Sequence, residues 1–265
     1  YTLSYLSSAG CFIYNKRIAD ENKTGSMYDL VRSGKWTTDK FFEIARKGTR
    51  DLDGNGKYDE NDQFGIISES AKAFYDSMII GSDIHYLERD SDGYPAFTLK
   101  TNEKGISFFQ KLVSVMKTDP YMYFDDSKDV NNATDAIKFE NGNALFMRTR
   151  TNFIGNYREM KDDFGIIPYP KFDEDQENYI TNVDGGHDVL CVPVTVSDTE
   201  RTGIITEALC AESYKKVVPA YYEVALKTKY TRDDESIAMI DNIVNSRVFD
   251  LGYVYDGWKG ASFIF

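Results

Sequence analysis

The chain has 265 residues, enough to bury a sizeable core in one or two domains, and its 42% hydrophobic and 14% aromatic residues describe a globular protein. A formal net charge of -12 argues against nucleic acid as a partner and against an anionic membrane surface, because both demand a basic face. No run of 18 apolar residues is present, so no segment has the composition of a membrane-spanning helix.

The first fifty residues show one strand pattern followed by helical ones. They predict a strand over residues 1–15, helices near 18–19 and over 27–32, and a helix that begins at Thr37 or Thr38. A threonine is a favourable helix N-cap, and apolar side chains recur at helical spacing after it. Trp36, just before this helix, is predicted to pack in the core.

An acidic loop of twelve residues follows, and it has the ligand spacing of a calcium-binding loop. Oxygen-bearing side chains fall at positions 1, 3, 5, 9 and 12, a glycine stands at position 6, and a backbone carbonyl serves at position 7. The predicted ligands are Asp51, Asp53, Asn55, Lys57 (through its carbonyl), Asp59 and Asp62. Because the carboxylates crowd together, a compact loop needs a hard cation, and Ca²⁺ is the predicted structural cofactor. Position 12 is Asp62 instead of the usual glutamate, so Glu60 is an alternative ligand, and a solvated acidic turn is the alternative reading.

Beyond this loop, short extended segments alternate with longer helical ones. The predicted elements are a strand over 64–67, a helix over 70–80, a hairpin within 83–99, a helix from Thr101 or Asn102, a helix near 132–140, a strand over 144–147, a polar loop over 148–152, a helix over 153–161, a strand over 164–167, a buried strand over 189–192, a helical region over 199–226 with a break at Ser213 or Pro219, and a helix headed by Asp233. This alternation indicates an α/β architecture.

The residue patterns of common enzymes are missing from the sequence. Only His85 and His187 are available, and neither belongs to a metal-binding pair; no GxSxG, GxGxxG or P-loop motif occurs. The doublets Asp125-Asp126 and Asp233-Asp234 could be the carboxylates of a glycoside hydrolase, but such doublets in an acidic protein are usually helix caps and surface residues. The chain is therefore predicted to be non-catalytic.

Polar and aromatic side chains near strand ends instead predict a carbohydrate site. Aromatic faces stack on sugar rings, polar side chains bind hydroxyls, and α/β sheets expose their ligands at strand ends. The candidate ligand-binding residues are Arg148, Arg150, Asn152, Asp184, His187, Tyr255 and Trp258. Arg148 and Arg150 could equally pair with surface acids, and Trp258 could equally be a packing residue.

Several segments, taken in order, resemble a known family. They are Tyr14-Asn15-Lys16, Gly34-Lys35-Trp36-Thr37, the acidic loop with Gln63-Phe64-Gly65, residues 139–146, residues 164–170, Ala220-Tyr221-Tyr222-Glu223 and residues 232–236. Their order over nearly the whole chain resembles the extracellular solute-binding proteins of bacterial ABC importers. The resemblance is to family 1, the maltose-binding-like group, and to lipoprotein members from Gram-positive anaerobes in particular.

This resemblance implies a periplasmic-binding-protein-like fold of class II, a two-lobed clamshell that closes on a sugar and delivers it to an ABC permease in the membrane. Residues 1–192 would form the second lobe with the hinge strands, 193–228 a return segment of the first lobe, and 229–265 a C-terminal segment of the second lobe. We therefore expect this sequence to be N-terminally truncated, with the family's N-terminal half-lobe and its lipid-anchoring cysteine upstream of Tyr1 in the full-length protein. The full-length protein is therefore expected outside the cell, anchored to its surface by lipid.

The sequence thus predicts the substrate-binding component of an ABC transporter that captures a sugar or oligosaccharide. Two alternatives remain at this point. One is a calcium-stabilised surface adhesion or interaction module, and the less favoured one is a glycoside hydrolase.

Overall fold

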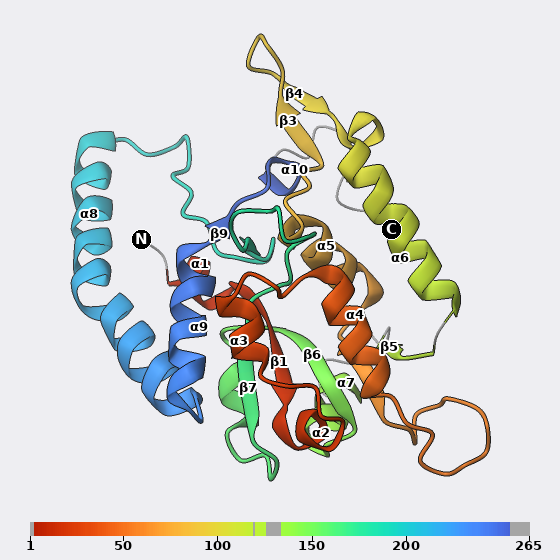
Figure 1. The fold of residues 1–265 in the computed structure, drawn as a ribbon. Helices are drawn as coiled ribbons and strands as arrows, with labels where there is room; N and C mark the ends of the chain where they lie inside the picture. The colour runs from red at the N-terminus through yellow and green to blue at the C-terminus, as the bar shows by residue number, and fades with distance from the viewer. Residues whose placement is uncertain (1–2, 119, 126–133, 255–265) are drawn as a thin grey trace.

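The computed structural model describes residues 3–118, 120–125 and 134–254 of the chain. It consists of a body, in which a central sheet lies between two groups of helices, and an arm (residues 188–230) that stands away from one side of the body (Figure 1).

The central sheet has five strands in the order β5-β2-β6-β1-β7. Their bounds are β1 Gly10–Asn15, β2 Phe64–Ser68, β5 Met122–Phe124, β6 Ala144–Arg150 and β7 Phe164–Ile167. Strands β5, β2 and β6 are parallel, whereas β1 runs antiparallel to β6 and β7. The carboxyl ends of β2, β5, β6 and β7 and the start of β1 therefore lie on the same side of the sheet. We call this side, which is formed by the ends of the strands and not by an outer strand, the strand-end edge.

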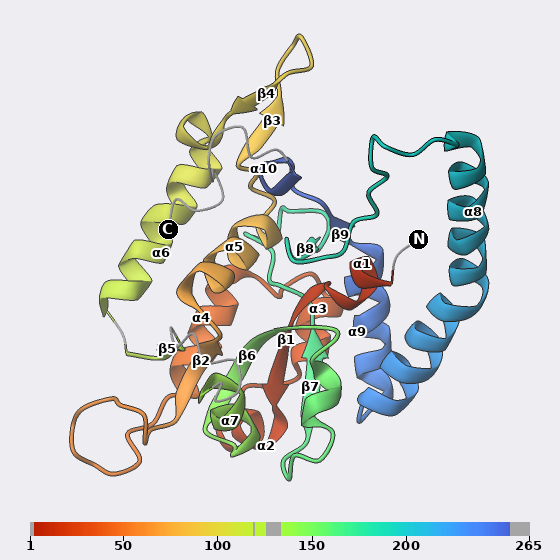
Figure 2. The same cartoon turned by 180° about the vertical axis from the view of Figure 1, so that it is seen from behind.

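Helices cover both faces of this sheet (Figures 1 and 2). On one face lie α2 Lys16–Glu21, α3 Met27–Arg32, α4 Thr38–Lys47, α5 Ala71–Gly81 and α6 Glu103–Thr118. On the other lie α1 Ser4–Ser7, α7 Thr134–Glu140, the 3₁₀ helix η2 Ile154–Tyr157 and α9 Asp234–Asn245. Because both faces are covered, the strands β1, β2 and β7 are buried along their whole length and read as continuous apolar runs.

Short elements complete the body. They are the hairpin of β3 Leu87–Arg89 and β4 Pro95–Phe97, the 3₁₀ helix η1 Leu99–Thr101, the parallel pair β8 Thr181–Asn182 and β9 Arg247–Val248, and α10 Leu251–Val254. The pair β8-β9 lies beside the start of β1, since Ala9 bridges Val183 and the Asp184 amide donates to the Ser8 carbonyl at 3.0 Å. Three segments distant in sequence therefore meet at the strand-end edge.

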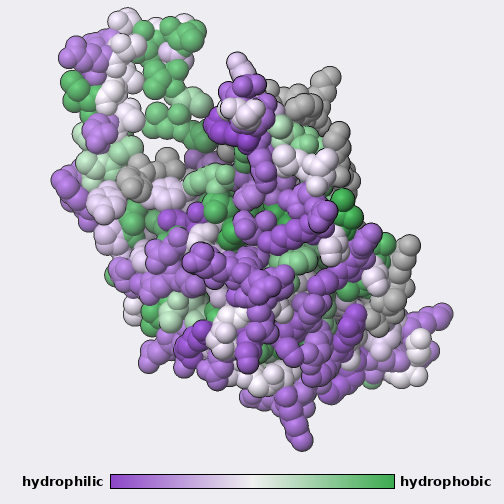
Figure 3. All heavy atoms as spheres, turned by 45° about the horizontal axis from the view of Figure 1, so that its top comes forward, coloured by the Kyte–Doolittle hydropathy of each residue, from purple (hydrophilic) through white to green (hydrophobic). Residues whose placement is uncertain are grey.

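The arm contains α8 Thr199–Glu212 and two π-helical stretches, η3 Ser213–Val217 and η4 Ala220–Tyr230. No residue of α8 is buried, and large apolar side chains such as Ile204 and Leu209 are exposed. Figure 3 shows hydrophobic side chains at the surface of this arm. The returning stretch η4 packs on the body, where Leu226 is fully buried among the residues of the α9 face.

Most predicted elements are confirmed, including α3, α4 with its Thr37 cap, the Asp90–Gly93 hairpin turn and the Asp233 cap of α9. Trp36 is fully buried and donates from Nε1 to the Pro168 carbonyl at 3.0 Å, which confirms its packing role.

Five predictions are wrong. Residues 4–7 form helix α1 instead of the start of a strand, and 148–150 continue β6 instead of forming a loop. Of the helix predicted over 153–161, only a 3₁₀ turn is present. Residues 189–192 are exposed and belong to none of the strands in the described residues. The helical region over 199–226 has no break, because Ser213 and Pro219 keep helical backbone angles and the helix changes there from α to π.

Leu226→Ala should lower the free energy of unfolding by about 2–4 kcal/mol, because it leaves a cavity where the arm returns to the body. Leu209→Ala on the same arm is the matched control and should change it by less than about 0.5 kcal/mol, since Leu209 is 63% exposed. Urea denaturation measures both values. Equal effects of the two substitutions would show that η4 does not pack on the body.

Candidate functional site

Charged side chains gather at the strand-end edge, where the ends of β2 and β6 lie next to the residues after β8. Glu69 follows β2, and Asp184 follows β8. Arg148 and Arg150 lie at the end of β6, two residues apart and therefore on the same face of the strand. The parallel pairing of β2 with β6 brings Glu69 and Arg148 together, and the bridge between residues 9 and 183 brings Asp184 to them.

Arg148 is the buried centre of this group, with 1% of its side chain exposed. Its Nε donates to the Ser77 hydroxyl at 3.1 Å, its Nη1 pairs with the Glu69 carboxylate, and its Nη2 lies 3.5 Å from Asp184 Oδ2. Burial acts to lower the pKa of the Arg148 guanidinium, but Tyr169, Glu69 and Asp184 outweigh it and raise that pKa. Arg148 therefore stays charged although it has almost no contact with water.

Asp184 joins the two arginines and the loop that follows. Its Oδ1 lies 3.1 Å from Arg150 Nη1 and accepts the Gly186 amide at 2.9 Å, and its backbone carbonyl lies 2.9 Å from His187 Nδ1. Burial acts to raise the pKa of the Asp184 carboxyl, but Arg150 and Arg148 lower it overall. The carboxylate is thus held ionised in a fixed position.

Aromatic rings flank this polar group. The Arg150 guanidinium lies over the Phe153 ring, 4.7 Å from its centroid, and Phe153 is 38% exposed. The His187 and Phe249 rings make an edge contact with centroids 5.2 Å apart. An arginine stacked on one face of a phenylalanine fixes the ring and leaves part of it accessible to a ligand.

Two further acidic residues belong to this region. Asp125 directly follows β5, and Asp135 lies in the first turn of α7. Asp125 is buried and accepts hydrogen bonds from Thr134, whose hydroxyl lies 2.8 Å away. Asp135 is buried, and its burial, together with Glu69 and Asp125, raises its pKa to about 6. The edge therefore contains one carboxyl group that titrates close to neutral pH.

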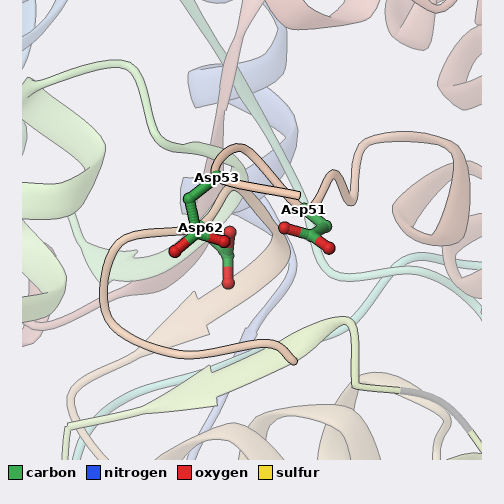
Figure 4. Close-up of side chains that lie close together, drawn as sticks. All are labelled: Asp51, Asp53 and Asp62. Atoms are coloured by element: carbon green, nitrogen blue, oxygen red, sulfur yellow. The ribbon is translucent and has the colours of Figure 1, made fainter. Parts of the chain in front are cut away.

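The acidic loop lies apart from this edge, at the end of α4. Its neck is closed by mutual backbone hydrogen bonds between Arg50 and Gln63, at 2.9 and 3.1 Å. The carboxylates of Asp51, Asp53 and Asp62 converge, with one oxygen of each within 4.8 Å of the others (Figure 4). Three hard oxygen donors at this separation suit Ca²⁺, which prefers such ligands.

Backbone amides fix these carboxylates. Asp51 accepts from Gly54 and Gly56 at 2.7 and 2.8 Å, and Asp62 accepts from Leu52 and Asp59 at 2.8 Å each. Gly56 has a φ of +76°, which the sharp turn requires and other residues rarely adopt. Asp62 is fully buried and is one of the three converging carboxylates, whereas Glu60 is exposed and offers its backbone carbonyl to Lys138.

Comparison with known proteins identifies the family to which this chain belongs. The family model described as bacterial extracellular solute-binding protein matches residues 1–233. The chain belongs to the bacterial extracellular solute-binding proteins. Curated protein sequences yield no match.

Solved structures agree on the fold. The maltose/maltodextrin-binding domain from Bdellovibrio bacteriovorus, bound to maltotriose, has a TM-score of 0.56 at 16% identity, over 91% of this chain and 59% of that one. An ABC substrate-binding protein from Listeria monocytogenes in complex with cycloalternan has a TM-score of 0.57 at 11% identity, over 91% and 58%. The maltose-bound MalE3 of T. maritima has a TM-score of 0.55 at 14% identity, over 91% and 60%. The chain thus spans about three-fifths of the length of these structures.

These findings confirm the predicted family and the α/β, periplasmic-binding-protein-like fold. Proteins of this family bind solutes and are not enzymes, which confirms the prediction of a non-catalytic chain. Among the residues described, no helix of this solute-binding protein has both the length and the apolarity needed to cross a membrane.

Of the predicted ligand-binding residues, the structure brings Arg148, Arg150, Asp184 and His187 together. Asn152 lies beside them and is exposed, and its backbone amide donates to the Ser7 carbonyl at 2.9 Å. Tyr255 and Trp258 lie outside the described residues.

Two residues of the edge escaped the sequence analysis. Glu69 carries no signal in the sequence, because its partner Arg148 is 79 positions away. Phe153 could have been found as an aromatic residue close after a buried strand, but the sequence pattern places it at the start of a helix over 153–161, of which only a 3₁₀ turn is present.

Asp135→Asn should remove a pH-dependent loss of stability. In the wild type, the folded state holds the Asp135 proton up to about pH 6, whereas the unfolded state loses it near pH 4, so stability falls as the pH rises between these values. The expected fall is at most about 3 kcal/mol, and the asparagine variant should not show it.

Urea denaturation at several pH values from 4 to 8 measures this effect, with Asp92→Asn in the exposed hairpin turn as the matched control. The control should follow the wild type across the range. If the free energies of unfolding of the wild type and Asp135→Asn differ by the same amount at pH 4 and at pH 8, the raised pKa of Asp135 is contradicted.

Proposed function

We propose that this chain is part of the substrate-binding component of an ABC transporter and that its solute is a carbohydrate. The observation that carries the proposal is the strand-end edge, where fixed carboxylates and guanidinium groups adjoin the exposed ring of Phe153. Sugars need this combination, since their hydroxyls take hydrogen bonds while their apolar faces stack on aromatic rings.

The structural neighbours support the same class of ligand. Their descriptions name maltotriose, cycloalternan and maltose, all of which are carbohydrates. Tyr255 and Trp258 remain predicted contacts of the solute.

The proposed mechanism is a population shift between open and closed forms of a two-lobed protein. A sugar that contacts both lobes only in the closed form stabilises that form, and an ABC permease in the membrane recognises it. Sugar-dependent stimulation of the permease ATPase by the intact protein tests this step, and equal stimulation without sugar would contradict it.

The second lobe in this proposal comprises residues 1–192 and 229–265, and residues 193–228 return to a first lobe. The exposed apolar side chains of α8, together with the three-fifths coverage of the structural neighbours, support a partner lobe over this arm. Leu209→Ala, which is expected to be neutral in the 265-residue chain, should then destabilise the intact protein by about 2 kcal/mol or more. A neutral result there would argue against this partner.

A lipid anchor at the cell surface, which the family resemblance implies, belongs to the same proposal; the extracellular character of the family supports it. Fractionation of cells with and without detergent tests it. Release of the intact protein by salt alone would contradict an anchor.

Phe153→Ala should weaken sugar binding by about tenfold, because it removes the ring on which the sugar stacks. Isothermal titration of the intact protein with maltose, maltotriose and raffinose measures this change. Tyr94→Ala is the matched control, since Tyr94 is an exposed aromatic residue of the β3-β4 turn far from the edge. No binding of any sugar by the wild type would contradict the proposed ligand class.

We also propose that the acidic loop binds one Ca²⁺ that stabilises the fold without touching the solute. The proposed ligands are those predicted from the spacing: Asp51, Asp53, Asn55, the Lys57 carbonyl, Asp59 and Asp62. The convergence of three of their carboxylates supports this site. Asn55, Lys57 and Asp59 stand outside that group of three and would complete the coordination.

Removal of calcium by EDTA should lower the melting temperature by about 5 °C, because an ion that binds only the folded chain stabilises it by mass action. The double variant Asp51→Asn, Asp62→Asn should melt at the lower temperature with or without calcium. Asp92→Asn should keep the response of the wild type. A melting temperature that does not change with EDTA would exclude the site.

A further inference from the structure

Glu69 stands at the strand-end edge as an accessible carboxylate, with 39% of its side chain exposed. Its partner, Arg148, is buried, so the ion pair holds the carboxylate from behind and leaves its outer side in contact with solvent. An ionised carboxylate has about four lone-pair sites, and one guanidinium does not occupy them all.

Arg148 holds a second carboxylate in the same way. Asp184 Oδ2 lies 3.5 Å from Arg148 Nη2, and 25% of the Asp184 side chain is exposed. Arg150 and the Gly186 amide fix the other oxygen of Asp184 at 3.1 and 2.9 Å. The two carboxylates are thus pre-positioned acceptors on either side of one buried cation.

The formal charges of these four side chains cancel, since two guanidinium groups face two carboxylates. An acidic solute would bring a third negative charge to the accessible acceptors and would be repelled. A cationic solute would compete with Arg148 for both carboxylates. Hydroxyl groups of an uncharged solute can instead donate to the unoccupied lone pairs and leave the ion pairs intact.

We propose that Glu69 and Asp184 are specificity-determining acceptors for the hydroxyl groups of an uncharged sugar, and that their pairing with Arg148 excludes acidic sugars. This inference rests on the proposed function, and it adds Glu69 as a solute contact and Arg148 as its positioning residue.

Glu69→Gln tests the inference, because it keeps the shape of the side chain and leaves one positive charge uncompensated. For the neutral sugar that the wild type binds most tightly, titration should show about a tenfold loss of affinity. Glucuronate, which the wild type should not bind, should bind the variant. Glu88→Gln on the exposed strand β3 is the matched control and should behave as the wild type with both ligands.

The melting temperature of Glu69→Gln verifies that the variant is folded. Unchanged affinity for the neutral sugar, or equal binding of glucuronate by wild type and variant, would overturn the inference. A wild type that binds no sugar would contradict the proposed function instead, whereas glucuronate binding confined to Glu69→Gln would still support the charge exclusion at this edge.

Discussion

A buried guanidinium costs several kcal/mol unless its charge is compensated and its donors are satisfied, and Arg148 meets both conditions with groups from three parts of the chain. Ser77 comes from α5, Glu69 from the end of β2 and Asp184 from the segment after β8. Because the loss of either carboxylate would leave the buried charge of Arg148 poorly compensated, the guanidinium holds both carboxylates in place. The polar surface at the strand-end edge therefore depends on a residue that is itself almost inaccessible to solvent.

The arm contains a helix that forms without burying a side chain in the described structure. Helix α8 has regular backbone hydrogen bonds and an Asp198 cap, but no buried side chain, whereas η4 returns to the body and buries Leu226. Local propensity is sufficient to form α8, but only tertiary contact can bury it. Its apolar residues, among them Ile204 and Leu209, therefore stay exposed although the helix itself is regular.

The negative charges of the acidic loop and of the strand-end edge are compensated in different ways. At the edge, arginines neutralise the carboxylates, so the surface is complete without an added ion. In the loop, Asp51, Asp53 and Asp62 converge and accept hydrogen bonds from backbone amides and from the Asn55 side-chain amide, which are neutral donors; this arrangement favours a bound cation. Strand β2 begins shortly after the loop and ends directly before Glu69, so a single strand links the two regions.

The sequence by itself determined the alternation of helices and strands, the helix caps, the acidic loop and the family, because these depend on local patterns and fixed spacings. It could not determine that residues 148–150 continue β6, since polar side chains at a strand end look like a loop until their partners are known. It likewise mistook 189–192 for a buried strand, because apolarity alone does not show whether another segment covers it. The pairing of Glu69 with Arg148 was decided only by the tertiary structure, as parallel strands align residues whose separation along the chain carries no signal.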